Sequence, residues 1–270
     1  MGTWPSKLIV RIYNSSAAKR KPSKTLQNKW YWLFKNVLFG PFLRLYNRPT
    51  ISGKDNIPST GGVILASNHQ SVMDSFYLPL LCNRQIQFPA KKEYFEGTGA
   101  WGAIQRWFFK SVGQIPIDRS SGDAAQAALD AGTAVVTNGG VLGIYPEGTR
   151  SPDGRIYRGK TGMARIAMAT GVPVVPVAML GTRQANPIGT WIPRPVKVRV
   201  IIGEAIDPVA WAEQRGLDPQ EYQTQRAFTD FVIYELARLT NEEYVDVYAA
   251  DVKKSLAAGA GYPAGTEPKE

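Results

Sequence analysis

Short apolar runs alternate with amphipathic stretches along most of the chain. The apolar runs read as β-strands: VILAS (63–67), QIQFPA (85–90), GQIPID (113–118), VLGIYP (141–146), VPVVPVAML (172–180) and VKVRVIIGEAI (196–206). The stretches between them read as helices: VMDSFYLPLL (72–81), WGAIQRWFFKSV (101–112), DAAQAALDAGTAVVTN (123–138) and KTGMARIAMAT (160–170). Strands that are apolar on both faces and alternate with helices predict an α/β fold, with a mostly parallel sheet flanked by helices on both faces. The last strands could join that sheet as an antiparallel addition.

The segments on either side of this region have patterns of their own. Residues 28–47, NKWYWLFKNVLFGPFLRLYN, place aromatic side chains between lysines and arginines. Residues 221–256 have the periodicity of one or two amphipathic helices, and the tail AAGAGYPAGTEPKE has no apolar period. The sequence therefore predicts three parts: an N-terminal segment at 1–50, one α/β domain at 51–210, and C-terminal helices with a mobile tail at 211–270.

The basic charge of the chain is concentrated at its N-terminus. The formal net charge is +10, and the residues before Asp55 include eleven lysines and arginines but no acid. An anionic membrane surface or a nucleic acid could each bind such an arm. The 28–47 segment favours the membrane, because clustered aromatic and basic residues suit an amphipathic helical hairpin, broken at Gly40-Pro41, that lies in the headgroup region. A pair of core helices with lysines that reach solvent is the alternative, and no apolar run is long enough to span a bilayer.

Cysteine and histidine are too scarce for several classes of site. Cys82 is the only cysteine and His69 the only histidine. A disulfide within the chain is excluded, and neither a thiolate nor a histidine metal centre is expected. A single cysteine also fits a reducing compartment.

His69 lies in NHQSVMD (68–74), directly after the predicted strand 63–67 and five residues before Asp74. Taken alone, this spacing is a weak signal, and a histidine satisfied by local backbone groups is the ordinary interpretation. At the end of a strand, however, the loop can fold the Asp74 carboxylate onto Nδ1 and leave Nε2 free to accept a proton. His69 and Asp74 are therefore the candidate general base and its orienting partner.

The sequence offers no well-marked nucleophile for this base. It contains no G-x-S-x-G elbow, and no motif surrounds Cys82. Ser71 and Ser75 leave a covalent serine mechanism open, but serine is also common in turns, and we expect Ser71 to be dispensable. A dyad without its own nucleophile suits direct attack by a substrate alcohol on an activated acyl group such as a thioester.

Polar residues that follow two other predicted strands suit an anionic substrate. Arg119 and Arg150 could clamp a phosphate between two guanidinium groups. Gly148 permits close backbone approach and Thr149 offers a hydroxyl, while Glu147 could hold an arginine or a substrate hydroxyl.

The blocks NHQSVMD, IPIDR, YPEGTRS and VPVVPV have the order and spacing of the four blocks of the glycerolipid acyltransferases. The chain resembles most closely the bacterial 1-acyl-sn-glycerol-3-phosphate acyltransferases, over about residues 51–206, so that 51–210 is identified as the acyltransferase domain. The resemblance implies that a fatty acyl group passes from acyl-CoA or acyl carrier protein to the sn-2 hydroxyl of lysophosphatidic acid, which gives phosphatidic acid. Glycerol 3-phosphate or another lysophospholipid is the alternative acceptor.

The same resemblance assigns roles to individual residues. His69 and Asp74 would be the catalytic His-x4-Asp pair, and the phosphate side would comprise Arg119, Glu147, Gly148, Thr149 and Arg150. Lys91 or Lys92, in AKKEY, would stabilise the charge that develops on the acyl oxygen. Lys160, in RGKTGMAR, would add positive potential. The chain departs from the family pattern at Tyr145, where a phenylalanine is usual.

The lipid substrate and product implied by the resemblance both stay in the bilayer. We therefore expect a peripheral or monotopic enzyme at the cytoplasmic face of the cell membrane, bound through its basic segment to anionic lipid. Neither a cofactor, apart from the acyl donor, nor a metal ion nor a nucleic-acid partner is expected.

One further motif favours a different class of protein. GTGAWG (97–102) fits G-x-G-x-x-G, and Asp118 follows 16 residues after its last glycine, as in a dinucleotide-binding oxidoreductase. However, KKEYFE separates this motif from the preceding strand, so the tight strand-to-helix turn is missing. A basic, non-enzymatic membrane-binding module is the other alternative.

Overall fold

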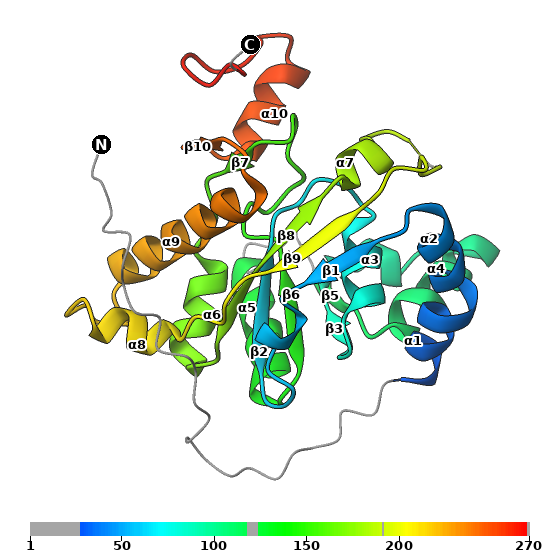
Figure 1. Cartoon of the computed structure of the whole chain (residues 1–270), viewed down its shortest axis with the longest axis horizontal. Helices are drawn as coiled ribbons and strands as arrows, with labels where there is room; N and C mark the ends of the chain where they lie inside the picture. Colours follow the sequence, from blue (N-terminus) through cyan, green and yellow to red (C-terminus); the bar gives the residue numbers. More distant parts are fainter. Residues whose placement is uncertain (1–27, 118–123, 191, 269–270) are drawn as a thin grey trace.

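The computed structural model describes residues 28–117, 124–190 and 192–268, and its centre is a six-stranded sheet (Figure 1). Its strands, in spatial order, are β1 (Thr50–Ser52), β9 (Arg199–Ile202), β8 (Val174–Leu180), β2 (Val63–Ser67), β6 (Val141–Ile144) and β3 (Ile86–Gln87). Every neighbouring pair is parallel except β8 and β9. The predicted mostly parallel sheet and the antiparallel addition at its end are both confirmed.

Helices cover both faces of this sheet because its inner strands are apolar on both. In β2, Val63 and Leu65 pack into the cluster that contains Tyr77 of α3 (Asp74–Leu81). Ile64 and Ala66 point the other way, into the cluster formed with the remaining helices. That second layer comprises α5 (Ala124–Thr137), α6 (Gly162–Thr170), α8 (Pro208–Glu213) and α9 (Tyr222–Thr240). The alternation along β2 is the two-residue period of a strand buried on both sides.

Two of the predicted strands leave the main sheet. QIQFPA divides into β3 and β4 (Pro89–Lys91), and β4 pairs with β5 (Ile115–Ile117) in a separate two-stranded sheet. The chain turns away at Phe88, whose N–H donates to the Gln114 side chain and whose carbonyl accepts from Ile115. The predicted strand at 196–206 is confirmed only as the shorter β9.

Several further elements, most of them short, lie outside the main sheet and the layers just described. They are η2 (Lys54–Asn56), η3 (Lys92–Phe95), α7 (Thr182–Ala185), β7 (Ile156–Tyr157), β10 (Tyr244–Val245) and α10 (Ala249–Ala257). Two- and three-residue strands such as β1, β7 and β10 carry no periodic signal, and the sequence did not predict them.

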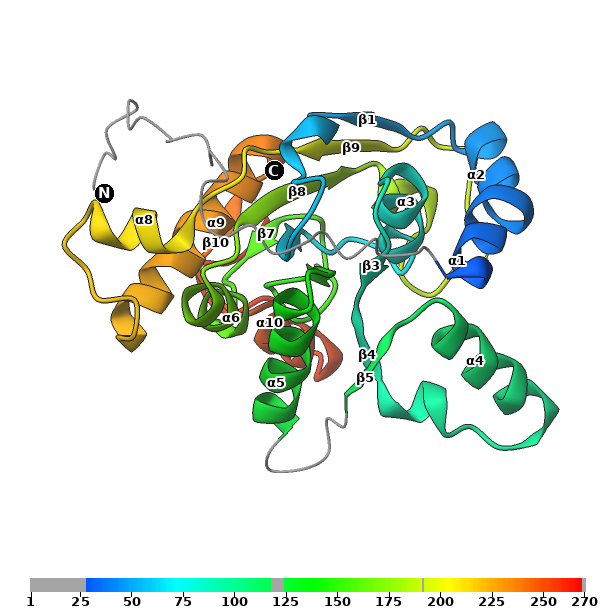
Figure 2. The same ribbon diagram turned by 90° about the horizontal axis from the view of Figure 1, so that it is seen from below.

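The 28–47 segment is helical, as predicted, and its helix is interrupted near Gly40. It forms α1 (Lys29–Leu33), a π-helical turn η1 (Phe34–Leu38) and α2 (Gly40–Tyr46). A Cβ at Gly40 would lie 1.7 Å from the Lys35 carbonyl oxygen, so only glycine fits there. Figure 2 shows α1 and α2 beside α4 (Gly99–Ser111) at one end of the molecule, far from α8. Phe34 and Trp30 make edge-to-face contacts with Phe108 and Trp107 of α4.

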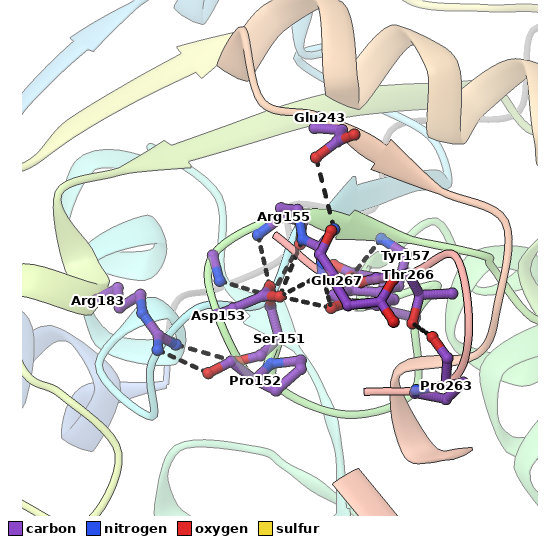
Figure 3. A network of polar contacts seen from close by, with 12 residues as sticks. Ser151, Pro152, Asp153, Arg155, Tyr157, Arg183, Glu243, Pro263, Thr266 and Glu267 are labelled. Carbon is purple, nitrogen blue, oxygen red and sulfur yellow. Dashed lines mark hydrogen bonds and ion pairs between the residues drawn. The ribbon is translucent and has the colours of Figure 1, made fainter. Parts of the chain in front are cut away.

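The C-terminal part folds back on the centre of the chain. β10 pairs in parallel with β7, and Ala249 and Val252 of α10 pack on Tyr157. The mobility predicted for the tail stays a prediction, but the tail does contact the centre of the chain. The Arg155 guanidinium donates to the carbonyls of Thr266 and Glu267, and Thr266 is buried (Figure 3). A guanidinium with several donors can hold such a segment without any apolar period in the segment itself.

No helix in the described parts of the chain combines the length and the hydropathy that crossing a bilayer requires.

Candidate active site

His69 and Asp74 form the predicted dyad. His69 Nδ1 lies 2.9 Å from Asp74 Oδ2, and the His69 side chain keeps 18% of its surface exposed while that of Asp74 is fully buried. VILAS forms β2, which ends at Ser67, so the following loop starts at the carboxyl end of this inner strand. Asp74 is the first residue of α3. If Nδ1 donates to the carboxylate, Nε2 is left with the free lone pair that a general base needs.

The same carboxylate oxygen also fixes the shape of the loop. Asp74 Oδ2 accepts from the backbone N–H groups of Gln70 at 2.7 Å and Ser71 at 2.9 Å. These donors lie in the loop before α3, and Asp74 itself is the first residue of that helix, where the helix dipole also stabilises a negative charge. One carboxylate therefore orients the imidazole and closes the turn that carries it.

The imidazole is also held by an aromatic partner. Its ring stacks on Tyr145, with centroids 3.8 Å apart and planes 11° apart. Tyr145 stacks in turn on Phe88, and its hydroxyl lies 2.8 Å from Ser75 Oγ. The sequence showed Tyr145 only as a departure from the family pattern; its contact with His69 joins residues far apart in the chain and has no local signal.

Glu147 does not face a substrate, contrary to the sequence-based assignment. Its side chain is fully buried, and its two oxygens accept from the backbone N–H groups of His69 at 3.2 Å and Tyr157 at 3.1 Å. Burial raises the pKa of Glu147 to about 8, although the two hydrogen bonds by themselves lower it. Because both oxygens are engaged with the backbone, Glu147 ties the His69 loop to β7 and is not available to a phosphate or an arginine.

An apolar cavity of about 580 Å³ opens at His69. Its walls include Phe34 and Leu43 from the N-terminal helices, Phe76 from α3, and Phe108 and Val112 from the α4 region. Arg150 lines it together with Gly148 and Thr149, so that a cation stands beside the apolar part of the wall. A long hydrocarbon chain fits such walls, and a negative headgroup fits beside the arginine.

The Gly148–Arg150 turn is the place where the sequence predicted an anion site. Gly148 has φ +75°, which favours glycine, and a Cβ there would lie 3.1 Å from the side chain of Lys160. The Thr149 hydroxyl accepts a hydrogen bond from Lys253 of α10 at 3.1 Å. Nothing near position 253 in the sequence predicted this contact, because 104 residues separate the two partners.

The structure places the two lysines of AKKEY differently, and it does not describe Arg119. Lys91 lines the cavity, as its predicted role requires. Lys92 does not line it and instead pairs with Glu96 at 3.3 Å, since the two are one turn apart in sequence. Arg119, like Asp118, lies outside the described residues, and its assignment to the phosphate side stays a prediction.

The two candidate nucleophilic serines are engaged elsewhere. Ser71 is buried and its hydroxyl donates to Asn186, while it accepts from the N–H of Met73. Ser75 lines the cavity but bonds to the Tyr145 hydroxyl. Ser71 therefore has a structural role in the loop, although direct attack by a substrate hydroxyl does not require a serine nucleophile.

The GTGAWG motif lacks the geometry of a dinucleotide site. β4 ends at Lys91, and η3 separates it from α4, which begins at Gly99. A Cβ at Gly102 would lie 2.3 Å from the Gly97 backbone, so this glycine serves a close chain contact.

Comparison with known proteins connects this site to a family. An acyltransferase family model matches residues 48–180, which include His69, Asp74 and the Gly148–Arg150 turn. A chloroplastic 1-acyl-sn-glycerol-3-phosphate acyltransferase of Brassica napus is 33% identical over 64% of this chain and 48% of its own length. A 1-acyl-sn-glycerol-3-phosphate acyltransferase of Pseudomonas aeruginosa is 30% identical over 59% of each chain. The match thus spans about half to three-fifths of the length of these relatives.

A solved structure supports the same relationship. The 1-acyl-sn-glycerophosphate acyltransferase PlsC of Thermotoga maritima superposes with a TM-score of 0.55 and 27% sequence identity, over 74% of this chain and 78% of that one. The covered part exceeds the family match, so the likeness extends beyond residues 48–180.

Proposed function

Residues 48–180 form an acyltransferase-family domain, and on that premise we propose that the protein acylates the sn-2 hydroxyl of 1-acylglycerol 3-phosphate to form phosphatidic acid. The observation that carries the proposal is the His69–Asp74 dyad at the mouth of an apolar cavity that also holds Arg150. The relatives that bear the corresponding name support the choice of acceptor.

The reaction follows from the position of the dyad. His69 Nε2 removes the proton of the acceptor hydroxyl as its oxygen attacks the carbonyl carbon of a thioester. The new C–O bond forms, the C–S bond breaks, and the thiolate leaves and takes up the proton from the imidazolium. Asp74 Oδ2 stabilises that imidazolium through Nδ1. No step requires a serine, a cofactor or a metal.

The rest of the site divides between the two substrates. The acyl chain of acyl-CoA or of acyl carrier protein occupies the apolar cavity, with Lys91 near the developing oxyanion. The acceptor phosphate binds at the Gly148–Arg150 turn, where the backbone comes close and Arg150 supplies charge. Arg119 lies outside the described residues, and its assignment to this side rests on the sequence and its resemblance to the acyltransferases alone. Glycerol 3-phosphate or another lysophospholipid is the alternative acceptor, because each presents a phosphate and a free hydroxyl.

An exposed apolar surface supports contact with a membrane. We call it the helical end surface; it consists of Trp30, Trp32, Val37, Leu38, Phe39, Phe42, Leu45, Trp101, Ile104 and Trp107 of α1, η1, α2 and α4. Leu45 and Trp101 expose 83% and 75% of their surface. An apolar patch of this kind, next to basic residues, suits insertion into the headgroup layer, here at the cytoplasmic face of the cell membrane. The lipid acceptor then enters the cavity from the bilayer.

An acceptor panel tests the proposal. The purified protein is given one acyl-CoA, or acyl carrier protein, with lysophosphatidic acid, lysophosphatidylcholine, glycerol 3-phosphate or monoacylglycerol. We expect the highest kcat/KM with lysophosphatidic acid. A preference for monoacylglycerol would contradict the assignment of a phosphate site. A preference for glycerol 3-phosphate would show that this compound, and not lysophosphatidic acid, is the acceptor.

A further inference from the structure

The C-terminal helix α10 brings an additional cation to the Gly148–Arg150 turn. β10 pairs with β7, the Arg158 N–H donates to Val247, and Val252 is buried. These contacts fix the helix so that Lys253 Nζ donates to Thr149 Oγ1, a residue that lines the cavity. Helix α10 lies beyond the end of the family match at residue 180.

A second cation reaches the same turn from α7. The Arg183 guanidinium donates to the carbonyls of Ser151 and Pro152, the residues after Arg150 (Figure 3). These partners are neutral, so the charge of Arg183 is not compensated by them. Partial burial, and next the charges of Arg150 and Arg183, lowers the pKa of Lys253. Lys253 is therefore close enough to Arg150 and Arg183 to be repelled by both.

No ion pair compensates this positive cluster in the part of the chain that the structure describes. Within residues 28–117, 124–190 and 192–268, Arg150, Arg183 and Lys253 form no ion pair with a carboxylate. Asp153, three residues after Arg150, pairs with Arg155 at 2.8 Å, and Glu147, directly before the turn, accepts from the backbone N–H groups of His69 and Tyr157. Like charges held together beside a glycine turn are stabilised by a bound anion.

We propose that Lys253, with Arg150 and Arg183, forms a phosphate-binding site at the cavity mouth, to which the C-terminal helix contributes a direct ligand. The inference rests on the proposed function, since it assigns further partners to a substrate phosphate. An ammonium has three donors, of which Thr149 takes one, so Lys253 can also donate to a phosphate oxygen. Arg183 sets the position of the turn and adds long-range charge.

The phosphate has two sources in this reaction, the acceptor headgroup and the donor. Lys253→Met removes the charge and keeps most of the side-chain length, Lys253→Arg keeps the charge, and Lys254→Met is the matched control on the exposed side of α10. We expect Lys253→Met to raise one KM about tenfold, the usual effect of losing a charged hydrogen bond, with little change in kcat. Lys253→Arg and Lys254→Met should keep KM within about twofold of the wild type, below the effect of such a bond.

The KM that changes identifies the source. A rise for lysophosphatidic acid assigns the acceptor phosphate, and a rise for acyl-CoA assigns the phosphates of the donor. Equal KM values for Lys253→Met and Lys254→Met, with both substrates, would overturn the proposed site.

A second readout separates this inference from the proposed function if the wild type transfers no acyl group. The melting temperature is then measured in inorganic phosphate and in chloride at equal ionic strength. Phosphate should stabilise the wild type and Lys254→Met, but stabilise Lys253→Met less. In that case, absence of this difference overturns the site.

Discussion

The imidazole of His69 lies flat on the phenol ring of Tyr145, with ring centroids 3.8 Å apart. Asp74 restrains the same imidazole at its Nδ1 edge. The imidazole is thus fixed by one hydrogen bond in its plane and by one ring across its face. Neither restraint involves Nε2, the nitrogen that the proposed mechanism uses.

Tyr145→Leu should lower kcat because it removes the aromatic face that orients His69. Loss of positioning at a catalytic group typically costs about 10- to 100-fold in rate. Tyr145→Phe keeps the ring and loses only the bond to Ser75, so we expect activity within a few-fold of the wild type. Steady-state kinetics of the two variants checks this, and equal kcat values for both would exclude an orienting role for the ring.

Glu147 should make the free energy of unfolding depend on pH between about 4.5 and 8. The folded protein holds this proton up to a pKa of about 8, while the ordinary value is 4.5. The stabilisation from the retained proton is therefore complete below pH 4.5 and is lost as the pH rises through 8. Urea unfolding at pH 5.5, 7 and 8.5 should show this decline.

Glu147→Gln provides the comparison for that experiment. It removes the titration, so the decline in the free energy of unfolding should be shallower. Its NH₂ group cannot accept, which leaves the N–H of His69 or Tyr157 without a partner and costs about 1–3 kcal/mol. The same pH dependence in the variant as in the wild type would assign the effect to another group.

Charges in the helical end surface should weaken membrane binding. Leu45→Glu and Trp101→Glu each place a carboxylate on an exposed apolar position, and we expect sedimentation with anionic liposomes to decrease. Tyr222→Glu, at an aromatic site on α9 that is 64% exposed, is the matched control. If Tyr222→Glu reduced liposome binding and the other two variants did not, the membrane contact would lie near α9 and not at the helical end surface.

Val112→Phe should shorten the acyl chain that the protein prefers. Val112 lines the cavity and packs on Tyr31 and Phe34, so a larger side chain fills part of the space. We expect kcat/KM to fall more for a long acyl-CoA than for a short one. A competition assay with both donors measures the ratio, and the circular dichroism melting curve controls for folding. An unchanged ratio would show that the acyl chain does not occupy the part of the cavity beside Val112.

The part of the site that lies within one loop could be predicted from the sequence. Asp74 is close to His69 in the chain, and a turn between a strand and a helix suffices to join them. The alternation of apolar runs likewise indicated the sheet, because strands such as β2 are apolar on both faces.

The contacts between distant segments could not be predicted in this way. Glu147 is polar and follows a strand, which suggested a substrate contact. In the structure its two carboxylate oxygens accept hydrogen bonds from the backbone N–H groups of His69 and Tyr157. The docking of the tail on Arg155 and of Lys253 on Thr149 depends on tertiary geometry that no local pattern encodes.

The most direct test of the account is the rate of acyl transfer to lysophosphatidic acid by His69→Ala. Loss of a general base lowers kcat by about 100- to 10,000-fold, and we expect a loss in that range. The melting temperature and liposome binding of the variant should match the wild type, since the backbone contacts of residue 69 remain. Wild-type acyl transfer by folded His69→Ala would contradict the role of this histidine as the base.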